Sequence, residues 1–434
     1  MYEAVITGLG VVAPNGVGKD MFWDAVTAGK SGIRRLKNLQ DSDCPCQIAG
    51  VVPPEWISEQ AGKLPEWIPD SKNSIYSVLA AILAFEDSGL STKDFSNWNS
   101  AVYMGVSIPD MDIYQAEYKC FLENGFVNPD SIIYAGPHTP ATLISHLFRT
   151  FTNVVTVSTA CTSGAVSINV AADNIMRGES DIVIAGGVEA PLSPFMLHFF
   201  SSAGLAPIGY NETPDKASRP FDNERESGLL SEGAGVIILE EKSKALRRKA
   251  RIYASFSSAG SSMAMNPSWM KTSFLKAMEM ALNEARLKPE DIDYISACAP
   301  GHPVIDQIEI EAIKEIFGER AYSVPISSLK SMIGNPGAAS GPRQYIFHRL
   351  CRIGFLRREF CRLSIPRYIF CRHCKPWFPA RVFYRLSIHR HIFFHPARLL
   401  FPGHWGDRIQ ARISCFYLLA EKFLPRAFRL LSIR

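Results

Sequence analysis

Hydrophobic and polar positions follow a regular pattern up to about residue 341 and no regular pattern after it. In the first part, short apolar runs rich in β-branched residues alternate with stretches in which apolar residues recur at helical spacing. Uninterrupted apolar runs are typical of parallel strands buried in a sheet, and their alternation with helices predicts an α/β protein. The predicted strands are Ala101–Val106, Asn153–Ser158, Asp181–Gly187, Val236–Glu240 and Tyr294–Cys298.

Two long helices are predicted between these strands. Thr162–Arg177 has apolar residues at 165, 168, 171, 172, 175 and 176, which is close to helical spacing. Residues 153–187 therefore predict a strand, a helix and a second strand in succession. Lys271–Arg286 is the other helix, and we interpret the charged run Glu240–Arg251 before it as a link between two halves of the chain.

The charge of the chain changes where the pattern stops. Residues 342–434 contain 19 Lys and Arg against 3 Asp and Glu, a net charge of +16, whereas residues 1–341 contain 27 against 39, a net charge of −12. Arg-rich, acid-poor sequence that also carries Cys and His is typical of a GC-rich gene read out of frame. We therefore hypothesise a frameshift near residue 342, which an intact reading frame found on resequencing would contradict.

Length and composition narrow the class of protein further. A chain of 434 residues, 47% of them hydrophobic, has room for two or three domains with sizeable cores. It contains no apolar run of about 18 residues, and its first residues, 1–8, read directly as a strand, so we expect neither a membrane span nor a secretory signal. These features predict a cytoplasmic protein whose ten cysteines are reduced.

Cys161 is the strongest candidate for a chemical role. It lies in Val157-Ser-Thr-Ala-Cys-Thr-Ser-Gly164, between a predicted strand and a predicted helix. Unpaired N–H groups at a helix N-terminus favour the thiolate, which predicts a lowered pKa and a nucleophilic sulfur. Gly164 permits close backbone approach, and an N–H beside the nucleophile can bind an oxyanion. The alternative is a small buried cysteine of the core.

Several motifs, in order along residues 1–341, resemble those of β-ketoacyl-[acyl-carrier-protein] synthases of the elongating type. They are Ile6–Gly16, Ser158–Gly164, Ala185–Ala190, Ala217–Asp222, Ser231–Val236 and Val324–Gly334. The resemblance implies a thiolase-type fold of two similar α/β halves in five layers (αβαβα), usually dimeric. It divides the chain into an N-terminal half at 1–245, a partial C-terminal half at 246–341, and a basic, poorly ordered tail at 342–434.

The resemblance also implies a reaction. The family's cysteine, here Cys161, takes an acyl chain from a carrier-protein thioester, and the acyl-enzyme is attacked by the carbanion that a malonyl thioester forms on losing CO2. Two histidines usually donate to the developing enolate oxygen. Here Cys298 stands at the place of the first histidine, aligned on Pro303 and Asp306, and Asn335 stands at the place of the second. Asn335 can donate one hydrogen bond, but a thiol is a poor donor.

Three further residues are candidates for the same site. His302 lies four residues after Cys298 on a Gly- and Pro-flanked loop and either enters the site or stays on the surface. Lys330 keeps its family place before Ser331-Met-Ile-Gly, where it supports the hydrogen-bond network and pairs with an acid, best matched by Glu309. Asp306 either belongs to this network or caps the helix that starts beside it.

The tail lacks what the family places near its C-terminus. A Gly-Phe-Gly-Gly-Asn-type loop, whose N–H completes the oxyanion hole, has no counterpart in residues 342–434, and neither do the last strands. Losing one oxyanion donor commonly lowers the rate ~10²–10³-fold. We therefore expect an inactive or badly folded chain. A pair of cysteines, Cys371-Arg-His-Cys374, lacks two further ligands for a metal, and the basic charge supports no specific nucleic-acid binding.

The leading prediction is an acyltransferase that condenses an acyl thioester with malonyl-carrier protein in fatty acid or polyketide synthesis. One alternative is a non-catalytic partner resembling chain-length factors, and another is a disrupted gene product. We expect no cofactor, because the acyl carrier protein brings the phosphopantetheine arm, and we expect a homo- or heterodimer. Phe195, Phe199 and Phe200 are predicted to fill core rather than to line an acyl tunnel.

Overall fold

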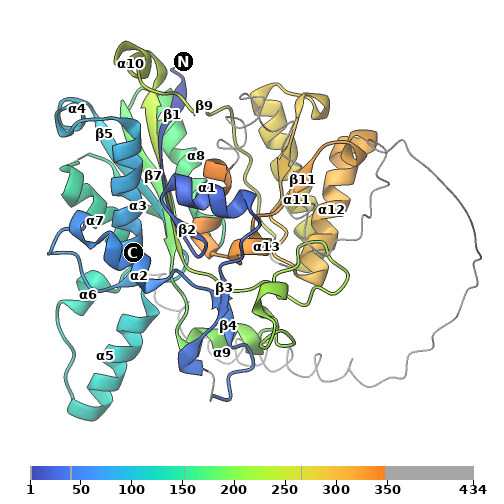
Figure 1. Cartoon of the computed structure of the whole chain (residues 1–434). Coiled ribbons are helices and arrows are strands. Elements are labelled where there is room, and N and C mark those ends of the chain that lie inside the picture. The colour runs from blue at the N-terminus through green and yellow to red at the C-terminus, as the bar shows by residue number, and fades with distance from the viewer. Residues whose placement is uncertain (1, 40–41, 151, 265, 348–434) are drawn as a thin grey trace, which may run out of the picture. The chain divides into compact units, whose positions relative to one another are not determined.

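The computed structural model describes residues 2–39, 42–150, 152–264 and 266–347 (Figure 1). Predictions that concern residues 348–434, including the cysteine pair at 371–374 and the missing glycine-rich loop, lie outside the described residues. Within the described part, no helix is both long enough and apolar enough to span a bilayer.

A mixed sheet forms the centre of the N-terminal half. Its strand order is β2 (Gly16–Val17), β1 (Ala4–Ala13), β8 (Gly233–Glu241), β7 (Ile182–Glu189), β5 (Ser100–Gly105) and β6 (Val154–Val157), and β9 (Ala254–Ser255) also pairs with β1. β5 is parallel to both β6 and β7, so the predicted strand–helix–strand unit places its strands on either side of β5. β8 is antiparallel to β7 and β1, although its apolar run had predicted another parallel strand.

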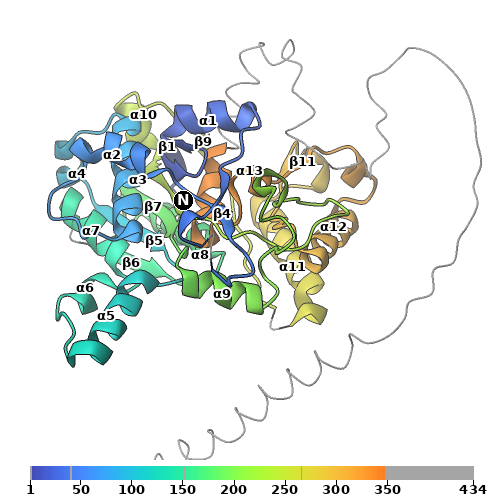
Figure 2. The ribbon, with the colours of Figure 1, turned by 60° about the horizontal axis from the view of Figure 1, so that its bottom comes forward.

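Helices cover both faces of this sheet. α3 (Lys72–Ser88) and α7 (Thr139–Phe148) pack on one face, while α1 (Lys19–Thr27) and α8 (Ser163–Met176) pack on the other. Figures 1 and 2 show α3 and α8 on opposite sides of the strands. Alternate residues of each strand enter the two cores, as the period of two requires; in β5, for example, Met104 faces α3 and Tyr103 faces α8. Because both faces are buried, the strands read as continuous apolar runs.

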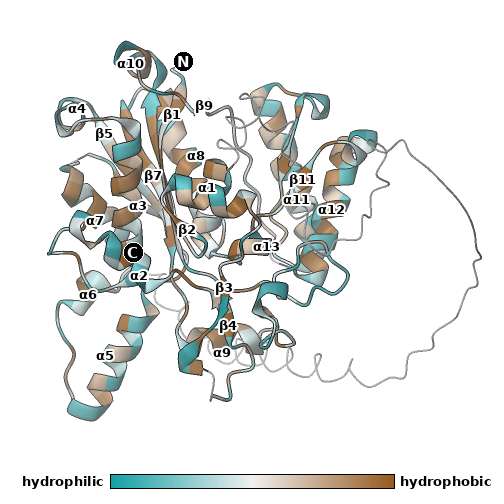
Figure 3. Cartoon of the chain, viewed as in Figure 1, coloured by the Kyte–Doolittle hydropathy of each residue, from teal (hydrophilic) through white to brown (hydrophobic). Residues whose placement is uncertain are grey.

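Glycines allow α3 to lie close to β1. A Cβ atom on Gly10 would fall 1.9 Å from the carbonyl oxygen of Ala80, and one on Gly8 would fall 2.1 Å from that of Ala84. No real side chain tolerates such distances, so the two glycines set the spacing between strand and helix. In Figure 3, apolar residues predominate along the strands and α3.

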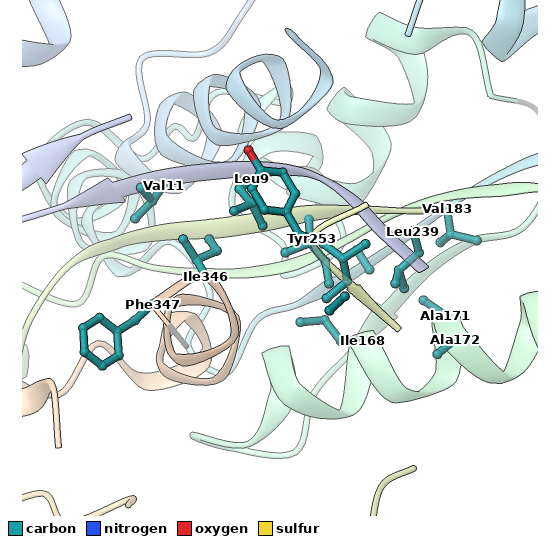
Figure 4. Close-up of a cluster of buried hydrophobic side chains, with 14 of the residues drawn as sticks. Leu9, Val11, Ile168, Ala171, Ala172, Val183, Leu239, Tyr253, Ile346 and Phe347 are labelled. Carbon is teal, nitrogen blue, oxygen red and sulfur yellow. The ribbon is translucent and has the colours of Figure 1, made fainter. Parts of the chain in front are cut away.

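The ordered chain continues past the predicted boundary at residue 341. Residues 340–347 are helical, and Ile346 and Phe347 are buried in the core that contains Leu9 and Val11. Figure 4 shows Ile346 directed at the strand that carries those two residues. The predicted boundary lies too early in the sequence, because the apolar residues at the start of the basic segment are also buried in the core.

The C-terminal half is smaller within the described residues. Two helices, α11 (Pro267–Ala285) and α12 (Pro303–Phe317), pack on each other beside a parallel pair of two-residue strands, β10 (Ile295–Ser296) and β11 (Ile326–Ser327). α11 begins four residues before the predicted start, because Asn266 caps it by accepting from the N–H of Trp269 at 3.3 Å and Pro267 follows at the first helical position.

The remaining α-helices and strands of the described part are shorter or lie outside the two cores described above. They are β3 (Ile33–Arg35), β4 (Ile48–Gly50), α2 (Pro54–Glu59), α4 (Thr92–Asn97), α5 (Met111–Asn124), α6 (Ser131–Tyr134), α9 (Pro194–Ser202), α10 (Lys242–Arg247) and α13 (Lys330–Ile333). The charged run predicted as a link contains the end of β8, the short helix α10 and the turn that leads to β9.

Candidate active site

Cys161 lies on a tight turn between β6 and α8. Ser163, at the start of α8, holds this turn: its Oγ accepts from the N–H of Thr159 at 2.8 Å and donates to the carbonyl of Ala160 at 2.5 Å. Ala160 has a φ of 53°, a left-handed conformation that costs a non-glycine residue of order 1–3 kcal/mol. The turn leaves Cys161 exposed, so a thioester can reach its sulfur.

Gly164 fixes this turn against the rest of the site. A Cβ atom there would lie 2.1 Å from the carbonyl oxygen of Ala338, in the short 3-10 helix Gly337–Ala339. On β7, a Cβ on Gly187 would lie 2.4 Å from the same oxygen. The backbones of α8, β7 and 337–339 therefore meet without side chains between them. The predicted close approach at Gly164 is confirmed.

Lys330 is a buried charge that acts on the thiol of Cys161. It is 4% exposed at the start of α13, and its Nζ donates to Sγ of Cys298 at 3.4 Å. The carboxylate of Glu309, on α12, accepts from the backbone N–H groups of Cys298 and Ala299, both at 2.7 Å. The charge of Lys330 also acts on Glu309, but the hydrogen bonds of this carboxylate go to the backbone of the loop that carries Cys298, and the predicted pairing of Lys330 with Glu309 stays a prediction.

The prediction that Cys161 has a lowered pKa is wrong. Desolvation by the surrounding protein raises the pKa of the thiol and outweighs the charge of Lys330, which lowers it; the buried carboxyl of Glu189 raises it further. Although the residue reaches solvent, protein atoms on its other sides replace the water that would stabilise a thiolate.

The alkylation rate of Cys161 by iodoacetamide is expected to rise with pH at a midpoint above about 8.5, the pKa of a free cysteine. Lys330→Met should move this midpoint to higher pH, because the lost positive charge no longer favours the thiolate. Lys276→Met, an exposed lysine on α11, should leave the midpoint unchanged. Mass spectrometry of the Cys161 peptide measures the rate, and a midpoint at or below that of free cysteine would contradict the expectation.

Asn335 lies at the end of the Val324–Gly334 motif. Its backbone N–H donates to the carbonyl of Leu229 at 2.6 Å, and its side-chain Oδ1 accepts from Ser340 Oγ at 3.3 Å. Because Oδ1 is engaged, the amide is oriented with Nδ2 as the group left to donate. This arrangement suits the predicted donor role, which stays a prediction.

His302 serves as a helix cap in the structure. Its Nδ1 accepts from the N–H groups of Val304 at 3.2 Å and Ile305 at 3.4 Å, which makes it the N-cap of α12. Partial burial lowers the pKa of the imidazole, which favours the neutral form that such acceptance requires. The predicted entry of His302 into the site stays a prediction, and would require this cap to break.

Asp306 connects the Ala217–Asp222 motif to the start of α12. Its buried carboxylate accepts from the N–H of Gly301 at 3.1 Å and of Phe221 at 2.9 Å, so it joins the Ala217–Asp222 motif to the loop before α12. Asp306 was predicted either to join the hydrogen-bond network or to cap α12. The cap of α12 is His302 instead.

Glu189 is a site residue that sequence reasoning missed. It is fully buried at the end of β7, where it accepts from Ser107 Oγ, from the N–H of Ile108 at 2.8 Å and from the N–H of Ala338 at 3.0 Å. Burial raises the pKa of this carboxyl. A glutamate directly after an apolar strand was the available indication, because a buried carboxyl needs donors around it.

The three aromatic residues of α9 were predicted to fill core, but not all of them do. Phe195 is 52% exposed and Phe199 is 59% exposed, with their rings stacked at 6.3 Å between centroids. Phe200 packs against two buried clusters, so the prediction is wrong for the first two residues only. A helix on the protein surface buries one face. Phe195 and Phe199 are four positions apart, so they lie together on the opposite, exposed face.

Comparison with known proteins gives the class of this fold and site. Residues 2–245 match the family model of the β-ketoacyl synthase N-terminal domain, and residues 250–351 match that of its C-terminal domain. The chain belongs to the β-ketoacyl synthase family. The predicted resemblance is confirmed, as is the thiolase-like α/β fold.

Curated relatives come from both fatty acid and polyketide synthesis. The chain is 33% identical to 3-oxoacyl-[acyl-carrier-protein] synthase 2 of Coxiella burnetii over 356 residues, 78% of this chain and 83% of the relative. It is 32% identical to the tetracenomycin polyketide synthase ketoacyl synthase alpha subunit of Streptomyces glaucescens over 383 residues, 84% of each. The chain is thus ketosynthase-like, within a family of condensing transferases.

Two solved structures resemble the chain closely in fold. One is a type II polyketide synthase acyl-carrier protein in complex with its ketosynthase bound to the hexaketide, with a TM-score of 0.72, 27% identity and coverage of 80% of this chain and 86% of that one. The other is the ishigamide ketosynthase/chain length factor, with a TM-score of 0.71, 26% identity and coverage of 80% and 85%.

Proposed function

We propose that the chain is an acyltransferase of the β-ketoacyl synthase class, which carries an acyl group on Cys161 and takes part in fatty acid or polyketide synthesis. The observation that carries this proposal is an exposed thiol, held on a strained turn at the start of α8, under the electrostatic influence of the buried Lys330. A nucleophile in such a place can attack a thioester without moving the backbone.

Acylation of Cys161 is the proposed first step. The Cys161 thiolate attacks the thioester carbon, the new C–S bond forms, and the bond to the phosphopantetheine sulfur breaks. The released sulfur takes up the proton that Cys161 lost. The N–H of Cys161 is the proposed donor to the oxyanion, and the positive charge of Lys330 favours the attacking thiolate. No cofactor is required of the chain itself, because the phosphopantetheine arm belongs to the acyl carrier protein.

Completion of the class reaction, decarboxylative condensation with malonyl-carrier protein, is proposed to be impaired. Asn335 offers one donor to the enolate oxygen, and Cys298 offers a thiol in place of an imidazole. The sequence after residue 347 also contains no glycine-rich loop to supply the second oxyanion donor. Each lost donor is expected to lower the rate of its step ~10²–10³-fold.

Labelling tests the proposal. Incubation with an acyl-carrier protein labelled in its acyl group is expected to place one label on each folded chain, at Cys161. Cys161→Ala should abolish the label, whereas Cys120→Ala, which removes a half-buried thiol on α5, should retain it. Absence of any label from folded wild-type chain would refute the acyltransferase proposal.

The second candidate function is a non-catalytic partner of an active ketosynthase. The substitution at Cys298 favours it, and the solved ketosynthase/chain length factor supports such a pairing in a related protein. This partner would take up no label, yet it would change the product length of an active ketosynthase on co-purification. A disrupted gene product would do neither.

We further propose that the chain dimerises, as a homodimer or heterodimer, through α5 and β6, the edge strand of the sheet within the described residues. No residue of α5 is fully buried, and four of its apolar residues are exposed: Tyr114 48%, Tyr118 64%, Phe121 52% and Leu122 65%. Figure 3 shows apolar and polar residues intermixed along this helix. β6 pairs with β5 on one side, and Val154 in it is 37% exposed. Exposed apolar patches of this kind mark interfaces.

Tyr118→Glu combined with Phe121→Glu is expected to convert dimer to monomer, because two charges would have to be buried at the interface. Sedimentation velocity of the full chain, alone and with a co-expressed ketosynthase, measures this. Leu246→Glu, at an exposed apolar residue of α10, is the matched control and should leave the assembly unchanged. A double variant that remains dimeric would place the interface elsewhere.

A further inference from the structure

The carboxylate of Glu189 joins three backbone segments that are far apart in the sequence. Its Oε1 accepts from the N–H of Ile108 at 2.8 Å, and its Oε2 accepts from Ser107 Oγ and from the N–H of Ala338 at 3.0 Å. Ser107 and Ile108 follow β5, Glu189 itself ends β7, and Ala338 lies in a short 3-10 helix. One fully buried side chain therefore holds the end of β5, the end of β7 and this 3-10 helix together.

The same three segments enclose the start of α8. A Cβ atom on Gly105, at the end of β5, would lie 2.3 Å from the backbone nitrogen of Gly164. One on Gly187, in β7, would lie 2.9 Å from the Cα atom of Gly164, and one on Gly164 would lie 2.1 Å from the carbonyl oxygen of Ala338. Backbones packed this closely cannot shift independently. A displacement of any of the three segments therefore moves Gly164 and the turn before it, which presents Cys161.

The charge of Glu189 opposes the chemistry that its contacts support. Each of its hydrogen-bond partners donates, which the ionised carboxylate accepts in full. A Cβ atom on Gly337 would lie 2.5 Å from Oε2, so the neighbouring backbone packs directly on the carboxylate and holds it in place. The negative charge raises the pKa of the Cys161 thiol and so disfavours the thiolate. A benefit of Glu189 to acylation can therefore come only from its geometry.

We propose that Glu189 is a positioning residue for acylation, which fixes the start of α8 so that the Cys161 sulfur meets a thioester in one orientation. The inference rests on the proposed function, because it concerns the acylation of Cys161. Glu189 is fully buried, so it acts on the reaction through Ala338 and the end of β5 and not by touching the substrate. A displacement of about 1 Å at a reacting atom can lower a rate ~10²-fold.

Two substitutions separate the geometry of Glu189 from its charge. Glu189→Gln removes the charge and turns an amide donor toward backbone N–H groups, whereas Glu189→Asp keeps the charge on a side chain one methylene shorter. Glu241→Gln is the matched control. Glu241 is 7% exposed at the opposite end of the sheet, and its carboxylate also accepts from two backbone N–H groups and a serine hydroxyl, those of Ser243 and Lys244.

Two measurements are made on the full chain and each variant. One is the rate at which acyl-carrier protein labelled in its acyl group labels Cys161, at increasing concentrations of the carrier protein. The other is the pH midpoint of Cys161 alkylation by iodoacetamide. Both Glu189 variants are expected to lower the maximal labelling rate about 10–100-fold and to leave the carrier-protein concentration at half-maximal rate unchanged.

The alkylation midpoint should fall in Glu189→Gln, because the thiolate no longer faces a negative charge. It should stay at the wild-type value in Glu189→Asp, and Glu241→Gln should change neither the midpoint nor the labelling rate. Slower labelling combined with a lower midpoint cannot result from the loss of charge alone, because that loss supplies more thiolate.

The inference is overturned if Glu189→Asp labels at the wild-type rate, if Glu189→Gln labels faster than the wild-type chain, or if Glu241→Gln slows labelling as much as the Glu189 variants do. Should both Glu189 variants prove unfolded by circular dichroism, Ser107→Ala decides. It removes one donor and leaves the carboxylate in place, so it should slow labelling about fivefold. An unchanged rate in that variant would equally overturn the inference. Failure of Cys161 to take any label in the folded wild-type chain would instead refute the proposed function.

Discussion

Glu309→Ala is expected to lower the free energy of unfolding by about 3–5 kcal/mol and to stop acylation of Cys161. The carboxylate is 4% exposed and accepts two backbone hydrogen bonds at 2.7 Å, from Cys298 and Ala299. Each N–H group left buried without an acceptor costs about 1–3 kcal/mol. The substitution also removes the carboxylate that interacts with the buried Lys330, so the ammonium loses part of what holds it near the two thiols.

Glu315→Ala is the matched control for this prediction. It changes the same residue type on the same helix, α12, but Glu315 is 54% exposed and forms a surface ion pair with Lys271 at 2.9 Å. Such pairs contribute about 0–1 kcal/mol. Urea unfolding followed by circular dichroism, together with Cys161 labelling, distinguishes the two variants. If both variants lose the same small amount of unfolding free energy, Glu309 is not required to hold the Cys298 loop.

The fold was predictable where the information is local to a strand or helix. Uninterrupted apolar runs placed β5 and β7, and helical spacing placed α8, within a few residues of their observed bounds, because each buries its own apolar side chains. The direction of β8 was not predictable in this way. Its apolar run reflects burial on both faces, which parallel and antiparallel strands share, whereas its direction depends on which strands it meets.

The site was predictable in its residues but not in its electrostatics. The Ser158–Gly164 motif correctly indicated a cysteine at a strand–helix turn, and Gly164 correctly indicated close packing. The pKa of Cys161 depends on how much water the folded protein removes around it, which no local motif specifies. In contrast, His302 could have been recognised as a cap, since Pro303 marks the first helical position and the residue before it is the N-cap.

Arg343 is the only charged residue of the basic segment among those that the structure describes, and it lies in the core. It is fully buried, and its Nη2 donates to the carbonyl of Glu232 at 2.9 Å. Its Nε and Nη1 have no hydrogen-bond partner among the described residues. Burial lowers the pKa of the guanidinium to about 9, so the group is still charged at neutral pH. A core that accommodates Ile346 and Phe347 a turn later is poorly suited to this residue.

Arg343→Met is therefore expected to raise the free energy of unfolding, by about 1–4 kcal/mol, the gain typical when a buried charge gives way to an apolar side chain of similar length. Arg247→Met, at an exposed residue of α10, should change it by less than about 0.5 kcal/mol. Urea unfolding at pH 7 measures both. The frameshift hypothesis requires that the free energy of unfolding rise for Arg343→Met and not for Arg247→Met. If the core had evolved with an arginine at position 343, it would have supplied hydrogen-bond partners for the guanidinium. Destabilisation by Arg343→Met would mean that the guanidinium is satisfied by a group outside the described residues, and would count against a break in the reading frame before it.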